Sequence, residues 1–68
     1  MIKYKINVLE SLKEAGYNTG RLRTEKLLGE NAIQSLRHDE MIGMKALDQV
    51  CTLLDMQPGN IIKYVPGT

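Results

Sequence analysis

NTGRLRTEKLLGENAIQSLRH, the stretch from Asn18 to His38, decides the fold of this chain. It predicts two short helices, over residues 19–26 and 30–38. Asn18 or Thr19 offers a side-chain oxygen that can cap the first of them. Residues 27–29, Leu-Leu-Gly, interrupt the helical pattern, and we expect Gly29 to supply the backbone freedom for the turn. The stretch therefore predicts a helix, a short turn and a second helix.

The second predicted helix has two different sides. Ala32, Ile33 and Leu36 recur at the spacing of one helical face, so we expect that face to pack on the domain. The other side carries side chains that can hydrogen-bond to base edges and phosphates: Glu30, Asn31, Gln34, Ser35, Arg37 and His38. Since one helix fits the major groove of B-DNA, this arrangement indicates a helix-turn-helix DNA-binding motif.

The composition indicates one small globular domain. The chain has 68 residues, close to the lower limit for a single core, and its 43% hydrophobic content argues against disorder. We therefore expect one domain over residues 1–68, and a core this small makes oligomerisation a natural source of extra stability. The single Cys51 cannot form an internal disulfide, and no leader pattern or long apolar run is visible. These features predict a cytoplasmic protein with no membrane segment.

The net charge of +1 does not by itself indicate a nucleic-acid partner, because many DNA-binding domains are far more basic. The placement of the charges is more informative. Four basic residues lie inside the motif: Arg21, Arg23, Lys26 and Arg37. Four acidic residues follow it: Asp39, Glu40, Asp48 and Asp55. We therefore expect a modest affinity for DNA that falls as the salt concentration rises.

Further elements are predicted on both sides of the motif. Residues 1–5 alternate as in a strand, and the apolar spacing predicts a helix from about Lys5 that Gly16 ends. Another helix is expected from Met44 to about Leu54, and Pro58 opens a last helical turn. Residues 63–65 are expected to be extended and to pair with the first strand. The prediction is an all-α, compact bundle of four to five short helices, with a small two-stranded pairing of the termini.

The chain offers no constellation typical of an enzyme. Cys51 and His38 have no second Cys or His to complete a zinc site, and Cys51 falls on an apolar helical stripe. Asp39 and Glu40 stand together in a predicted loop without a partner that suggests acid–base chemistry. We therefore expect no catalytic activity, no metal and no cofactor.

Longer segments of the chain resemble a known family. They are LKEAGYNTGRLR, GENAIQSLR and ALDQVCTLLDMQPGNIIKYVP, and above all the ending D-x-Q-P-G-x-I-x-x-Y-V-P from Asp55 to Pro66. From about Ile6 to Pro66 the chain resembles the Cro and phage-repressor-like (XRE-type) helix-turn-helix proteins. The ending resembles a compact subgroup of bacterial and phage repressors. The resemblance implies a lambda-repressor-like bundle.

The resemblance also implies a partner and a set of contacts. The partner is double-stranded DNA, with base contacts at Glu30, Asn31, Gln34 and Ser35. Phosphate contacts are implied at Asn18 and Thr19, and the chemistry of the side chains adds Arg21, Arg23, Arg37 and His38. We expect a homodimer that represses transcription by covering a promoter, with no small-molecule effector. Two departures concern the turn: Arg23 replaces a small residue that many members have, and Leu27 stands where many have glycine.

Other interpretations stay open from the sequence. The polar side of the second motif helix could be an ordinary solvated face, and the motif arginines could simply pair with Glu25 or Glu30. His38 could interact with the C-terminal end of its helix instead of a phosphate. A different function is also compatible with the low net charge: a protein-interaction module, for example an antitoxin-like partner, whose DNA binding is weak or lost.

Overall fold

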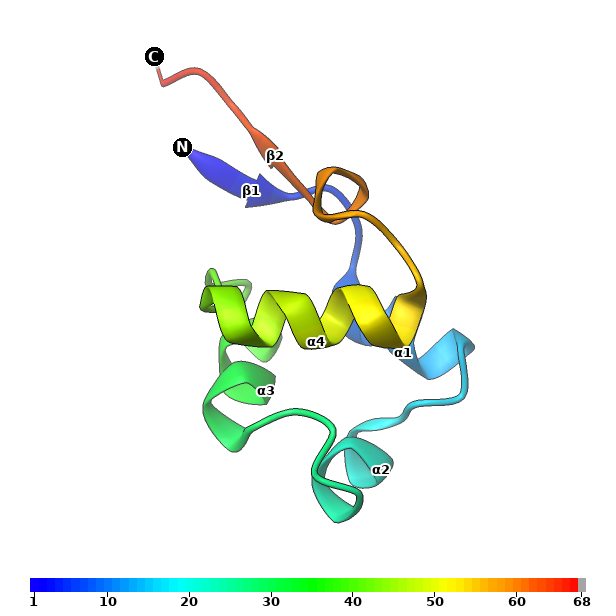
Figure 1. Cartoon of the computed structure of the whole chain (residues 1–68). Helices are drawn as coiled ribbons and strands as arrows, with labels where there is room; N and C mark the ends of the chain where they lie inside the picture. The colour runs from blue at the N-terminus through cyan, green and yellow to red at the C-terminus, as the bar shows by residue number, and fades with distance from the viewer. Residues whose placement is uncertain (68) are drawn as a thin grey trace.

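The computed structural model describes residues 1–67, which form four α-helices, one 3-10 turn and two strands (Figure 1). In chain order they are β1 (Ile2–Tyr4), α1 (Val8–Glu14), α2 (Thr19–Thr24), α3 (Glu30–Arg37), α4 (Met44–Leu54), η1 (Pro58–Asn60) and β2 (Ile62–Tyr64). The predicted helical bundle with a two-stranded pairing of the termini is confirmed. The sheet projects from one end of the bundle and α2 lies at the other, and the molecule measures 40 × 21 × 19 Å.

One apolar core joins the four helices. Its buried side chains come from every helix and from the segments between them: Val8, Leu12, Leu22, Leu28, Ile33, Ile42, Leu47, Val50 and Ile61. Leu27 directly follows the residues predicted for the first motif helix. That side chain is only partly buried, and Leu28 reaches the core instead because α2 ends two residues earlier than expected.

The start of α1 differs from its prediction. Apolar spacing predicted a helix from about Lys5, but α1 begins at Val8 because Asn7 caps it. The Oδ1 atom of Asn7 accepts a hydrogen bond from the backbone N–H of Glu10 at 3.1 Å, which satisfies one of the free donors of the first turn. The other end is confirmed: Gly16 has a φ of 97°, and the N–H of Tyr17 donates to the carbonyl of Leu12 at 2.7 Å.

The sheet fastens both termini and the loop between α3 and α4. β1 and β2 are antiparallel, and Tyr4 is paired with Ile62. The hydroxyl of Tyr4 donates to the carbonyl of Glu40 at 2.6 Å and accepts from the N–H of Ile42 at 3.1 Å. Burial raises the pKa of this hydroxyl, so the group remains protonated and able to donate at neutral pH. Tyr4 thereby links the sheet to the segment that connects α3 with α4.

Candidate nucleic-acid interface

The helix-turn-helix consists of α2, a five-residue turn and α3. Asn18 caps α2, because its Oδ1 atom accepts from the N–H of Arg21 at 2.8 Å. At the other end Lys26 adopts a left-handed conformation with a φ of 54°, and the N–H of Leu27 donates to the carbonyl of Leu22 at 2.9 Å. Gly29 has a φ of −69° and is the N-cap of α3. The expectation that Gly29 supplies the turn's backbone freedom is therefore wrong, because Lys26 makes the left-handed turn.

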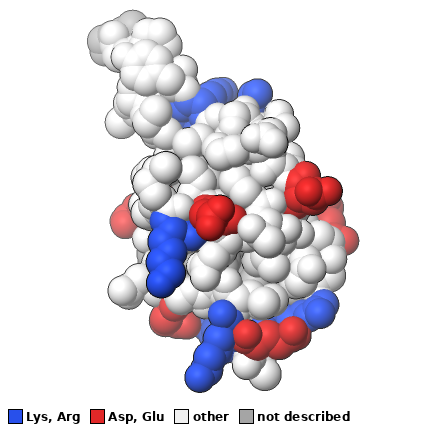
Figure 2. Space-filling view, viewed as in Figure 1, with Lys and Arg blue, Asp and Glu red and all other residues white. Residues whose placement is uncertain are grey.

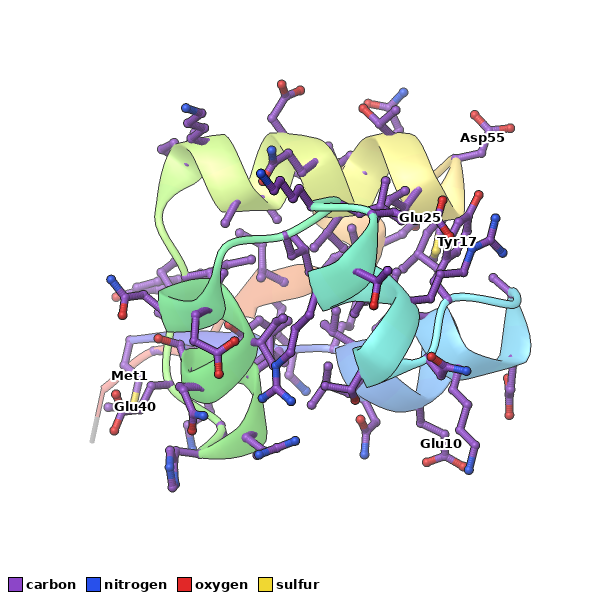
Figure 3. All side chains as sticks on the ribbon, turned by 90° about the horizontal axis from the view of Figure 1, so that it is seen from below. Met1, Glu10, Tyr17, Glu25, Glu40 and Asp55 are labelled. Carbon is purple, nitrogen blue, oxygen red and sulfur yellow. The ribbon has the colours of Figure 1, made fainter. Side chains whose placement is uncertain are left out.

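The two motif helices lie together on the face opposite the sheet (Figure 3). Ile33 is fully buried and anchors α3 to the core, with Ala32 and Leu36 partly buried beside it. The remaining side chains of α3 are exposed or half-buried: Glu30, Asn31, Gln34, Ser35 and Arg37, followed by His38 at the C-cap. The polar and apolar sides of α3 therefore lie as the sequence predicted.

Three residues predicted to contact DNA are bonded to one another. Arg23 of α2 donates from Nε and Nη2 to the two carboxylate oxygens of Glu30, at 2.8 and 2.9 Å. Gln34, one turn further along α3, donates from Nε2 to Glu30 Oε1 at 3.3 Å. The hydrogen bond from Arg23, followed by the one from Gln34, lowers the pKa of the Glu30 carboxyl below its ordinary value. We call these three residues the clamp; they join α2 to α3 across the turn.

Arg21 is also engaged within the protein. Its guanidinium forms an ion pair with Glu25 and donates from Nη1 to the carbonyl of Gly16 at 3.0 Å. The same group lies 4.9 Å from the centre of the Tyr17 ring. The sequence left open whether the motif arginines pair with Glu25 and Glu30, and in the structure Arg21 and Arg23 do so. Arg21 fastens α2 to the end of α1.

Two of the hollows beside α3 hold residues predicted to contact DNA on either side of the helix. One, of about 930 Å³, lies between α1, the start of α2 and the end of α3, and brings Asn18, Thr19 and Arg37 together with Lys13. The other, of about 510 Å³, separates α3 from the start of α4 and is lined by Asn31 and Ser35 on one side and by Lys45 and Gln49 on the other. Three predicted phosphate contacts thus lie on one side of α3 and two predicted base contacts on the other, while Arg23 lies with Glu30 and Gln34.

A family model for the Cro/C1-type HTH DNA-binding domain matches residues 7–67 of the chain. The chain belongs to this family. A search of curated proteins found no match, and neither did a search of solved structures. Membership confirms the resemblance seen in the sequence, and it gives the chain a helix-turn-helix domain that binds DNA and serves in transcription regulation. It is a family of DNA-binding domains and not of enzymes.

The charge on this Cro/C1-type domain is mixed. Figure 2 shows basic and acidic side chains interspersed on the face in view, without a broad field of one sign. Within residues 1–67, ion pairs form at Arg21 and Arg23 alone. The other basic side chains near the motif are not paired with a carboxylate and can contact a phosphate. These are Lys13, Lys26, Arg37 and Lys45. Lys45, at the start of α4, was missed from the sequence because its nearness to α3 depends on how α4 packs.

Neither a metal site nor a membrane helix is found in the part of the chain that the structure describes. No three His, Cys, Asp or Glu side chains there gather closely enough to bind an ion. Cys51 is half-buried on α4 and packs against the core, as its apolar stripe predicted. None of the described helices of the domain combines the length and hydrophobicity needed to cross a bilayer.

Proposed function

We propose that this Cro/C1-type protein binds double-stranded DNA sequence-specifically by inserting α3 into the major groove. The observation that carries the proposal is the split of α3 between a buried apolar side, centred on Ile33, and an outward side with Asn31 and Gln34. A helix held by the core presents amide side chains in fixed positions, and amides can form two hydrogen bonds with adenine. Base contacts at Asn31, Gln34 and Ser35 follow from this placement; Glu30 needs a separate argument because Arg23 already pairs with it.

The phosphate contacts of the proposal surround α3. Asn18 and Thr19, at the start of α2, share a hollow with Arg37 and Lys13, which supports a phosphate bound near that side, although Glu10 and Glu14 line the same hollow and offset the charge of the two cations. His38 is exposed at the end of α3, and Lys45 lies across the second hollow, on the other side of α3; both support further phosphate contacts. Few free cations surround the motif, so we expect a shallow salt dependence compared with strongly basic DNA-binding proteins.

We further propose that the protein acts as a cytoplasmic homodimer and represses transcription by covering a promoter. A two-fold axis would place the two α3 helices about 34 Å apart, in successive major grooves of a near-palindromic site. The sheet end supports a protein contact because Met1, Ile2 and Tyr64 are exposed together there, with Ile2 paired to Tyr64, and grouped exposed apolar side chains are typical of contact surfaces. Sedimentation at micromolar concentration tests the dimer.

A titration against the DNA upstream of the protein's own gene, at several salt concentrations, tests the function. Preferential binding to one segment over random DNA of equal length supports sequence-specific regulation. Equal binding to both, at every salt concentration, contradicts it. In addition, Asn31→Ala should weaken binding to the preferred segment by roughly 1–3 kcal/mol while binding to random DNA stays nearly constant.

One observation favours a second candidate, a protein-interaction module of the antitoxin type. The ion pairs Arg21–Glu25 and Arg23–Glu30 neutralise two of the cations that the motif could offer to DNA. A gene for a toxin-like protein beside this one, together with a stable complex of the two products and no binding to upstream DNA, would favour this candidate over the regulator.

A further inference from the structure

We propose that the clamp of Arg23, Glu30 and Gln34 orients the Gln34 amide to bind adenine, with Arg23 and Glu30 acting as positioning residues that touch neither bases nor phosphates. The inference rests on the proposed insertion of α3 into the major groove. It reassigns two residues that the sequence had placed in direct contact with DNA. It also names the base that this part of α3 selects.

The hydrogen bonds determine which way the Gln34 amide points. Nε2 donates one of its two hydrogens to Glu30 Oε1 at 3.3 Å, so the carbonyl oxygen Oε1 of Gln34 is directed away from the carboxylate. Adenine offers an N6 donor and an N7 acceptor in the major groove. The Gln34 oxygen can accept from N6, and the second hydrogen on Nε2 can donate to N7. The bond to Glu30 remains in place throughout.

The bond between Arg23 and Glu30 keeps the carboxylate in place as the acceptor for the Gln34 amide. Both oxygens of Glu30 accept from the guanidinium, at 2.8 and 2.9 Å, which holds the carboxylate ionised and in one orientation. An ionised carboxylate only accepts hydrogen bonds, so it favours the amide nitrogen of Gln34 over the amide oxygen. If Glu30 instead accepted from a cytosine, its oxygens would have to be shared with Arg23 or released from it.

The negative charge of Glu30 gives a second reason for its pairing with Arg23. A lone carboxylate at the first residue of α3 would repel the phosphates on either side of the groove, whereas the guanidinium of Arg23 cancels it locally. The side chains of Arg23 and Glu30 are 41% and 56% exposed, and ion pairs this exposed contribute little to folding. The consequence of the clamp is therefore the orientation of Gln34, and its loss should appear in base preference rather than in stability.

The experiment starts with a random-sequence DNA duplex library, from which the wild-type protein selects its preferred site. Binding is then measured to that site and to each of its single-base substitutions. We expect Gln34→Ala to reduce the preference at one A·T pair by roughly tenfold to hundredfold. Glu30→Ala should relax the preference at the same pair, and Glu30→Ala combined with Gln34→Ala should lose no more than Gln34→Ala alone. Glu30→Gln keeps one acceptor oxygen but adds a donor, so it should relax the preference less than Glu30→Ala does.

A charge-neutral double substitution tests the role of Arg23. Arg23→Gln with Glu30→Gln leaves the net charge unchanged, so the salt dependence of binding should equal that of the wild type. If Arg23 contacts a phosphate, the slope of log K against log salt falls by about 0.9. The matched control is Arg21→Gln with Glu25→Gln, which removes the other ion pair of α2 and should leave the base preference intact.

Three results would overturn the inference. Glu30→Ala could alter the preference at a different base pair from Gln34→Ala, which would make Glu30 itself a base contact. The charge-neutral double substitution at Arg23 and Glu30 could flatten the salt dependence. Finally, a selection that yields no shared sequence would contradict the proposed function itself and the role of Gln34 with it, whereas the first two results leave the proposed function standing.

Discussion

The two ends of the molecule expose different sets of side chains. The sheet end exposes Met1, Ile2 and Tyr64, between 47% and 68% exposed, beside Lys3 and Lys63, while the end formed by α2 and α3 exposes amides and ion pairs. Tyr4 links the sheet to the loop between α3 and α4, and Ile33 is the fully buried side chain of α3. The comparison indicates that apolar burial holds α3 in place, and that the exposed polar contacts orient its side chains without stabilising the fold appreciably.

The largest effect should come from cutting the apolar anchor of α3. Ile33→Ala removes a fully buried side chain and leaves a cavity, so we expect the free energy of unfolding to fall by about 2–5 kcal/mol. In a domain this small, that loss is enough to unfold much of the population. Urea denaturation followed by circular dichroism measures it. Asn31→Ala, on the exposed side of the same helix, is the control and should change stability by less than about 0.5 kcal/mol.

A smaller loss is expected at the sheet end from Tyr4→Phe. The substitution keeps the ring but removes the hydroxyl that bonds the carbonyl of Glu40 and the N–H of Ile42, and the latter is left partly buried without that acceptor. We expect a loss of about 1–3 kcal/mol in the same denaturation experiment. Tyr64→Phe, on an exposed tyrosine of the same sheet, should be almost neutral. Equal losses from both would mean that the hydroxyl bonds of Tyr4 do not hold the loop.

The turns before and after α2 place two different residues, a glycine and a lysine, at positive φ, so the effect of each residue there can be compared. Gly16 and Lys26 both have positive φ, and at both the chain closes a helix with the same pattern of hydrogen bonds. Gly16→Ala should cost about 1–2 kcal/mol through backbone strain. Lys26→Gly should gain up to about 1 kcal/mol, because relief of strain is partly offset by the larger unfolded-state entropy of glycine. Melting temperatures that move in the same direction would contradict this assignment.

The sequence predicted some of these features and missed others. The faces of the helices and the bounds of α4 were predicted well, because apolar periodicity over several turns reports directly on which side is buried. The start of α1 was missed because Ile6 continues the apolar spacing past the cap at Asn7. The backbone freedom of the turn was assigned to Gly29 on propensity, yet the left-handed residue is Lys26, two residues before the buried Leu28.

The sequence predicted which residues of α3 face outward at the candidate site, but not which of them bond to one another. The outward residues of α3 were named correctly as a face, since that follows from the helical period alone. The bond between Arg23 and Glu30 joins residues seven apart on two helices, and its geometry depends on the length of the turn between them. Pairs within one helix, such as Arg21 with Glu25, have a recognisable spacing of four. Contacts across a turn have no such spacing.

The smallest effect concerns the ionisation of Glu30. Its pKa in the folded protein is lowered, first by the hydrogen bond from Arg23 and then by the one from Gln34, so the stabilisation that accompanies its charged form is complete above the ordinary glutamate pKa, about 4.3, and is lost as the pH falls through the lower folded value. Because the carboxyl is exposed, we expect a visible titration and little change in melting temperature. In Arg23→Gln, NMR of the Glu30 side chain should show the titration midpoint moving up toward the ordinary value, and in Gln34→Ala it should move less. Identical midpoints in the wild type and in Arg23→Gln would show that the clamp does not persist in solution, and α3 would then face DNA with a carboxylate that nothing neutralises.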